Sequence, residues 1–225
     1  MLIWGSSWLA IHFQLGEVAP EVSIAYRFIL ASGLLVIWCR LRSISLRIAL
    51  HHHPFLVLLG LSLFSLNYFL FYYAAFELAT GLLAVIFSTM TVMNIFNSAL
   101  FLGRQIQKKT VLAVVFGLTG MALVFWPEIT TSGPQAAAAI GISLIATYLA
   151  SIGNIVSARN QNHGLPVASA NAIGMAYGAL FMLAYSAGSG VPFMIDTSAT
   201  YIGSLLFLAL FASAIAFGCY LTLVG

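Results

Sequence analysis

The sequence predicts an all-α membrane protein, and three observations lead to this fold class. Hydrophobic residues make up 62% of the 225 residues and charged residues only 6%, whereas soluble domains are about 25% charged. The hydrophobic residues form long continuous runs, which are typical of membrane helices and not of the short alternating strands of membrane barrels. Basic residues gather in every second connection between these runs. We therefore predict a multi-pass helical protein and exclude a soluble fold.

Eight runs are apolar enough to be transmembrane helices, each of which needs about 20 mainly apolar residues. The predicted spans are residues 1–15, 23–41, 54–76, 80–102, 111–126, 136–158, 166–187 and 199–224. The first run is short, because Gly16, Glu17 and Pro20 end it. It lacks the basic start and the small-residue cleavage site of a signal peptide, so we interpret it as a membrane helix whose beginning is short or missing.

The charged connections predict how the chain crosses the membrane. Seven of the eight Lys and Arg residues lie at or after the ends of the second, fourth and sixth helices: Arg40, Arg42, Arg47, Arg104, Lys108, Lys109 and Arg159. The other connections hold none. Positive charge in short loops marks the cytoplasmic side. We expect an inner-membrane protein with both ends of this chain in the cytoplasm. The net charge of +3 follows from this bias, so lipid and not nucleic acid is the expected partner.

Arg27 is the one basic residue that lies several residues inside a predicted span and not at its end. It follows Pro20 by seven residues, which places it about 10 Å below the outer surface at 1.5 Å per residue. In one interpretation it pairs with Glu21 or Glu77, or extends outward, and so holds helix ends together. An ionisable residue inside a membrane also suggests a functional site, here contact with an anionic group of a solute. Both interpretations stay open.

Aromatic and amide side chains of the first and third helices are candidates for a solute site, because aromatic rings offer flat apolar surfaces with a polar edge. We select Trp8, Asn67, Tyr68 and Tyr72. Trp4 and Tyr73 are equally well explained as interfacial anchors. His12 is able to titrate near neutral pH, but a histidine near a helix end also serves in packing.

Polar residues form stripes on the fourth and sixth helices. The stripes contain Ser88, Thr91, Asn94 and Ser98 on one helix, and Ser143, Thr147, Ser151 and Asn154 on the other. Facing stripes would line a hydrated path, or would join the helices by hydrogen bonds. From these two helices we select Thr91, Asn94, Tyr148 and Asn154 as candidates for substrate binding.

The remaining features favour structure over chemistry. Three adjacent histidines at 51–53 cannot easily face one metal ion, and the segment before them resembles a short amphipathic surface stretch. Gly174 and Gly178 form a small-residue ridge, which we expect to pack within the molecule. The five acids are scattered in or beside the connections that lack Lys and Arg: they are Glu17, Glu21, Glu77, Glu128 and Asp196. The sequence has no metal spacing, phosphate loop or nucleophile elbow. We predict no catalytic residue, no metal, no cofactor and no enzymatic activity.

An internal repeat appears when the chain is compared with itself. An offset of about 146 residues aligns Pro20 with Pro166, and an offset of 147 aligns Tyr73 with Tyr220 and the segment 61–65 with 208–212. Units of five helices would be inverted relative to each other, as in many secondary transporters. The predicted units are residues 1–127 and 136–225, the second of which stops after its third helix. On this basis we expect two more helices beyond it, in roughly 50 to 70 residues.

Several stretches resemble the EamA-like branch of the drug/metabolite transporter superfamily. They are WGSSWLAI at 4–11, PEVSIAYRFILA at 20–31 and FLG at 101–103 before a basic loop. The resemblance implies a ten-helix permease of two inverted five-helix repeats, with a substrate cavity between them. Family members usually carry a proline where Thr91 stands and a glutamate where Arg104 stands, so local kinking and loop contacts are expected to differ here.

The function we predict is that of a permease. It would move a small organic metabolite or a drug-like solute by alternating access, with export as the expected direction. The alternative is a membrane packing or sensing module without transport. The sequence does not indicate which solute is carried, which ion is coupled, or the oligomeric state.

Overall fold

Helices form all the regular secondary structure in the part of the chain that the computed structural model describes, residues 2–106, 108–131 and 134–224. The all-α prediction is therefore confirmed. Among the described residues, six helices are long and apolar enough to cross a membrane: Pro20–Leu41, Leu50–Ala74, Thr80–Leu102, Gln135–Asn162, Val167–Gly188 and Ala199–Leu223. They correspond to six of the eight predicted spans.

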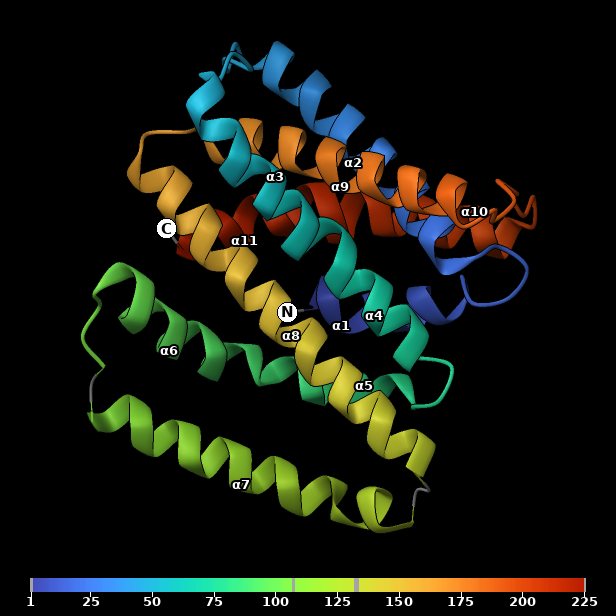
Figure 1. Ribbon diagram of the computed structural model, residues 1–225, viewed down its shortest axis with the longest axis vertical. Helices are drawn as coiled ribbons and strands as arrows, with labels where there is room; N and C mark the ends of the chain where they lie inside the picture. The colour runs from blue at the N-terminus through green and yellow to red at the C-terminus, as the bar shows by residue number, and fades with distance from the viewer. Residues whose placement is uncertain (1, 107, 132–133, 225) are drawn as a thin grey trace.

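The other two predicted spans fall on helices of different character. α1 (Leu2–His12) has 11 residues, fewer than the roughly 20 that a bilayer requires. α7 (Lys108–Thr131) has 24 residues and lies at the edge of the bundle, beyond α6 (Figure 1). Neither is among the six, so a total of eight transmembrane helices stays a prediction.

Two of the six long helices contain a π-helical segment. The first runs from η1 (Leu50–His52) through α3 (His53–Leu61) and the π segment η2 (Ser62–Leu66) to α4 (Asn67–Ala74). The second runs from α10 (Ala199–Phe207) through the π segment η3 (Leu208–Ile215) to α11 (Ala216–Val224). A π segment widens the turn locally and often occurs at functional sites.

The remaining long helices begin and end where proline and glycine predict. Pro20 stands in the first turn of α2 (Pro20–Leu41), where its missing N–H costs no hydrogen bond. A third helix divides at Thr89 into α5 (Thr80–Ser88) and α6 (Met90–Leu102), and Gly103 ends it with φ of 66°. The last two long helices are α8 (Pro134–Asn162) and α9 (Val167–Gly188).

The centre of the bundle is the contact between α2 and α9, which lie side by side in Figure 1. α9 also packs on α3, and α8 packs on α3, α4 and α6. Glycines permit the close approach of α3 to α9: a Cβ atom on Gly60 would lie 2.5 Å from the carbonyl oxygen of Gly174 and 2.9 Å from the nitrogen of Gly178. The small-residue ridge of α9 is therefore used within the molecule, as predicted.

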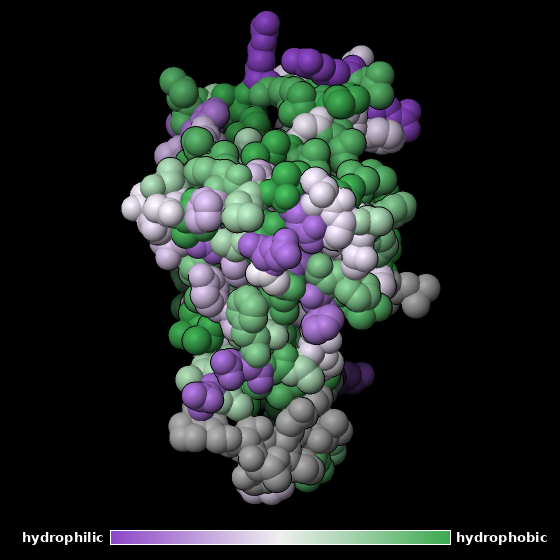
Figure 2. Space-filling model, turned by 90° about the vertical axis from the view of Figure 1, so that its right-hand side faces the viewer, coloured by the Kyte–Doolittle hydropathy of each residue, from purple (hydrophilic) through white to green (hydrophobic). Residues whose placement is uncertain are grey.

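The basic connections all lie at one end of the bundle. The segments that follow α2, α6 and α8 are at the left of Figure 1, and the connections before α2, α5, α8 and α10 are at the right. We call these the basic end and the acidic end. Figure 2 looks onto the acidic end, where hydrophilic residues are interspersed among hydrophobic ones. The connections with and without basic residues thus lie at opposite ends of the bundle, as their alternation along the chain predicts. Which end faces the cytoplasm stays a prediction.

Candidate functional site

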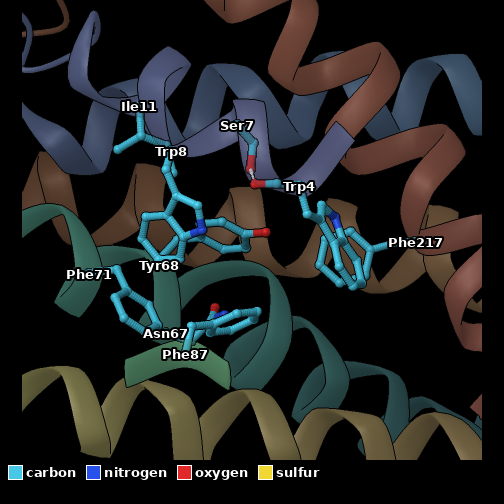
Figure 3. A pocket seen from close by; sticks show the side chains of 9 residues that line it. All are labelled: Trp4, Ser7, Trp8, Ile11, Asn67, Tyr68, Phe71, Phe87 and Phe217. Atoms are coloured by element: carbon cyan, nitrogen blue, oxygen red, sulfur yellow. Dashed lines mark hydrogen bonds between the residues drawn. The ribbon is translucent and has the colours of Figure 1, made fainter. Parts of the chain in front are cut away.

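A narrow cavity lies between helices of both predicted units. Its volume is about 30 Å³, enough for one or two water molecules and too small for an organic solute. Nine residues from α1, α4, α5 and α11 surround it (Figure 3): Trp4, Ser7, Trp8, Ile11, Asn67, Tyr68, Phe71, Phe87 and Phe217. Three of the predicted site residues, Trp8, Asn67 and Tyr68, are therefore brought together here.

Aromatic rings form most of the cavity wall. The ring of Trp8 lies edge-on to Phe71 and Phe87, with centroid distances of 5.3 and 5.9 Å. Such edge-to-face pairs stabilise the wall beyond the burial of their area. The polar groups of the wall are few, and one of them, the side-chain oxygen of Asn67, is buried without a hydrogen-bond partner in the described residues. The wall is therefore mainly aromatic, with a few polar groups.

The first polar cluster is built around Arg27, which is only 1% exposed. Its Nε donates to Oγ of Ser213 over 2.9 Å, and its Nη2 donates to the hydroxyl of Tyr68 over 3.3 Å. The guanidinium carbon also lies 4.3 Å from the centroid of the Tyr68 ring, a cation–π geometry. We call Arg27, Tyr68 and Ser213 the arginine cluster. Through Tyr68 it touches the cavity.

The surroundings of Arg27 argue against the interpretation in which it pairs with an acid or extends outward. Its partners are hydroxyl groups and aromatic rings, and within the described residues no ion pair joins it to Glu21 or Glu77. It also does not extend outward, because its side chain is buried. A buried cation is costly without compensation, and its Nη1 has no hydrogen-bond partner in the described part of the chain. Nη1 is therefore able to bind an anionic group.

Tyr72 lies beside this cluster and not in the cavity wall. It is fully buried, and its hydroxyl donates to Oε1 of Gln14 over 2.7 Å. This bond ties α4 to the segment that follows α1. Tyr72, a predicted site residue, thus supports the position of its neighbour Tyr68 through the rigidity of α4.

The second polar cluster joins α6, α8 and α11. The Nδ2 of Asn154 donates to the hydroxyl of Tyr220 and to Oδ1 of Asn94, each over 3.2 Å, and Nδ2 of Asn94 donates to the same hydroxyl over 3.3 Å. Asn97 continues the contact with a bond of 2.9 Å to Oγ of Ser151. We call Asn94, Asn154 and Tyr220 the asparagine cluster. Its two amides confirm that polar residues of the fourth and sixth predicted helices meet.

Trp4 connects the asparagine cluster with the cavity. Its ring lies 4.8 Å from that of Tyr220 in an edge-on arrangement, and its Nε1 donates to the carbonyl oxygen of Ala212 over 3.3 Å. Trp4 also lines the cavity. Its ring is half-buried and also packs on the ring of Phe217, and both interpretations of Trp4 stay predictions. The cavity therefore borders the arginine cluster through Tyr68 and the asparagine cluster through Trp4.

The polar stripes of the fourth and sixth predicted helices contribute fewer residues to the cavity and the two clusters than expected. The side of α6 that meets α8 carries Met90, Asn94 and Asn97, while Thr91 is exposed. Tyr148 is 44% exposed, so this structure places neither Thr91 nor Tyr148 at the cavity. Other hydroxyls of the stripe on α8 bond to the backbone of their own helix, Ser143 to Ala139 and Thr147 to Ser143. Because these hydroxyls are bonded to their own helix, they offer few hydrogen bonds to water along the hydrated path that the stripes would line.

Sequence reasoning missed several members of the site: Ser213, Tyr220, Ile11, Phe71, Phe87 and Phe217. The alignment of Tyr73 with Tyr220 drew attention to Tyr220 without suggesting a role. The sequence signal that could have identified Ser213 and Tyr220 is that each is a polar residue in an otherwise apolar helix. Of the three adjacent histidines, His53 forms a hydrogen bond with the hydroxyl of Tyr177 over 2.6 Å.

Comparisons with known proteins agree with this architecture. The EamA-like transporter family matches residues 1–126, more than half of the chain. Protein PagO of Salmonella typhimurium is 26% identical over 131 residues, a match that covers 58% of this chain and 43% of that protein. A solved crystal structure of a protein, 16% identical, superposes with a TM-score of 0.77 over 99% of this chain and 75% of its own. At that identity the likeness shows the fold alone.

Proposed function

Because the chain belongs to the EamA-like transporter family, we propose that it carries a small organic solute by alternating access through the cavity between its two halves. A membrane transporter agrees with the six apolar helices. The chain spans less than half of the length of the curated relative that it matches, so the activity of the whole protein is part of this proposal. We propose export of a metabolite or a drug-like compound, as the family resemblance suggests.

The observation that carries the proposal is the pair of polar contacts that cross between the halves. Arg27 of the first predicted unit bonds Ser213 of the second, and Asn94 of the first bonds Asn154 and Tyr220 of the second. The cavity adjoins both contacts. In the proposed cycle, separation of one contact opens the cavity to one side of the membrane while the other contact keeps it closed. The present small cavity corresponds to a state in which both contacts are made.

The helix boundaries support two related halves. α2 and α9 both have 22 residues and begin 147 positions apart, at Pro20 and Val167 (167 − 20 = 147). The π segments begin 146 positions apart, at Ser62 and Leu208 (208 − 62 = 146). Each π segment lies in a helix that contributes to the cavity. We propose that these wide turns absorb the bending that the cycle requires, since π segments inside α-helices are frequent at functional sites.

Arg27 has a specific role in the proposal. Its free Nη1 would bind a carboxylate or another anionic group of the solute, and the aromatic wall would hold the apolar part. A guanidinium suits this task because it is planar, always charged and able to bond several acceptors at once. Asn67, with its unpaired buried oxygen, would accept a hydrogen bond from a donor of the solute.

A vesicle flux assay tests the function. The full-length chain is reconstituted, and uptake and efflux of a mixed metabolite pool are compared between wild type, Arg27→Gln and Asn94→Ala. The matched controls are Arg47→Gln and Asn162→Ala, which remove the same groups from exposed positions. We expect loss of flux for particular solutes in the first pair only, at equal amounts of protein in the membrane. If no solute moves in the wild type, the chain is a packing or sensing module and not a permease.

A further inference from the structure

A large open groove lies on the outside of the bundle, away from the cavity. Its volume is about 620 Å³, and it runs between α2 and the η3–α11 helix. We propose that this groove binds an acyl chain of an anionic phospholipid, whose phosphate is held by Arg42 at the basic end. This proposal is independent of the transport activity.

The groove exists because two neighbouring helices diverge. α2 packs on η3, whereas α11 packs on α8 and α9. The space between α2 and α11 therefore widens toward the basic end, and the start of α9 closes its floor with Val167 and Ala168. The absence of a side chain at Gly218, which has no atom near its missing Cβ position, keeps the groove open.

The lining fits a hydrocarbon chain. On α2 the walls are Leu34, Leu35, Ile37, Trp38 and Leu41, and on the opposite helix they include Leu210, Ala214 and Ile215. The one hydroxyl in the lining, that of Thr222, donates to the carbonyl oxygen of Gly218. Apart from the indole N–H of Trp38 and the thiol of Cys219, the rest of the lining is hydrocarbon, which suits an acyl chain because such a chain needs no hydrogen-bonding partner.

Charge at the mouth of the groove identifies the lipid as anionic. The guanidinium of Arg42 lies 4.8 Å from the centroid of the Trp38 ring, which is itself a wall of the groove. This cation–π contact holds the charge at the point where an inserted chain would leave the groove. Basic residues next to a membrane helix attract anionic headgroups, by about 1 kcal/mol each. Arg42 is therefore complementary to a lipid phosphate with its chain in the groove.

Quenching of tryptophan fluorescence by brominated acyl chains tests the proposal. The full-length chain is placed in nanodiscs with brominated phosphatidylglycerol or brominated phosphatidylcholine, and the signal of Trp38 is isolated by subtracting that of Trp38→Phe. We expect quenching at an about fivefold lower fraction of phosphatidylglycerol, the effect of roughly 1 kcal/mol from one basic residue. Arg42→Gln should remove this preference, while Arg47→Gln, a loss of the same charge from an exposed position at the same end, should retain it.

A second pair of variants tests the groove itself. Gly218→Leu fills the groove and should weaken quenching by both lipids, whereas Gly203→Leu, at an exposed position outside the groove with equal free space, should not. Equal quenching by the two lipids in the wild type overturns the proposal, as does an equal effect of Arg42→Gln and Arg47→Gln. Cross-linking of the exposed Cys219 to a second copy, together with absence of quenching, would assign the groove to a protein contact instead.

Discussion

Nε of Arg27 donates to Oγ of Ser213 over 2.9 Å, so a buried cation of α2 is held by a hydroxyl of a π segment 186 residues later. In a membrane interior such a contact fixes which groups pair, because neither lipid nor neighbouring apolar side chains offer a hydrogen-bond acceptor in its place. It also makes the position of η3 dependent on the charge of Arg27. A substitution in either polar cluster should therefore change both the free energy of unfolding and the proposed transport cycle.

Ser213→Ala is expected to lower the free energy of unfolding by about 1 kcal/mol, the usual size of a polar contact between membrane helices. It leaves Nε of Arg27 buried without an acceptor and so favours opening at the arginine cluster. Unfolding in mixed micelles measures the stability. Ser204→Ala is the matched control, since Ser204 is buried but donates to the backbone of its own helix. Equal losses in the two variants would contradict a special role for Ser213.

Arg27 variants are expected to separate recognition of charge from folding. Arg27→Lys keeps the charge but loses the planar donor geometry, so it should retain partial flux of anionic solutes. Arg27→Gln should abolish that flux while a neutral solute of similar size still moves. The measurement is the ratio of anionic to neutral flux in vesicles. An equal decrease for both solutes in both variants would show that Arg27 has a structural role only.

Tyr220→Phe is expected to destabilise the asparagine cluster, because the amides of Asn94 and Asn154 both donate to the hydroxyl that it removes. In a double-mutant cycle with Asn154→Ala, we expect a coupling energy of about 0.6 kcal/mol, and at most about 1.7. The free energies of unfolding of the four proteins supply this value. Additive effects would mean that the hydroxyl and the amide do not interact.

Gly178→Ala is expected to destabilise the fold by several kcal/mol or to prevent its formation. The new Cβ would lie 2.9 Å from the carbonyl oxygens of Gly60 and Phe64, and these are backbone atoms that cannot move independently of their helix. Gly203→Ala serves as the control, because its Cβ has no neighbour within 4 Å. Membrane yield and melting temperature would distinguish the two variants. Similar values for both would contradict the close approach of α3 and α9.

Cysteine labelling tests the predicted orientation. In a chain with Cys39→Ser and Cys219→Ser, we introduce Ser189→Cys at the acidic end or Gln105→Cys at the basic end; both positions are exposed. In right-side-out vesicles an impermeant maleimide should label the first variant at once and the second only after permeabilisation, because basic connections stay in the cytoplasm. The reverse pattern would overturn the orientation.

The site illustrates which predictions a membrane sequence supports. Arg27, Asn94 and Asn154 were predictable because polar residues within long apolar runs are rare and costly. Thr91 and Tyr148 were selected on the same grounds, yet both are exposed. In a soluble protein the polar face of a helix points to water, and this contrast identifies the buried face. Lipid is as apolar as the protein interior, so the pattern of these helices carries little information about which face is buried.

The sequence by itself determined the membrane class, the helix positions and the separation of basic and acidic connections, because each depends on local composition and on charge near helix ends. The tertiary structure decided which polar groups meet. Ser213 and Tyr220 belong to the site only because η3 packs on α2 and α11 packs on α8, and these contacts join segments that are far apart in the sequence. The close approach of α3 to α9 at Gly60, Gly174 and Gly178 likewise joins segments that are far apart in the sequence, and local composition does not determine such contacts.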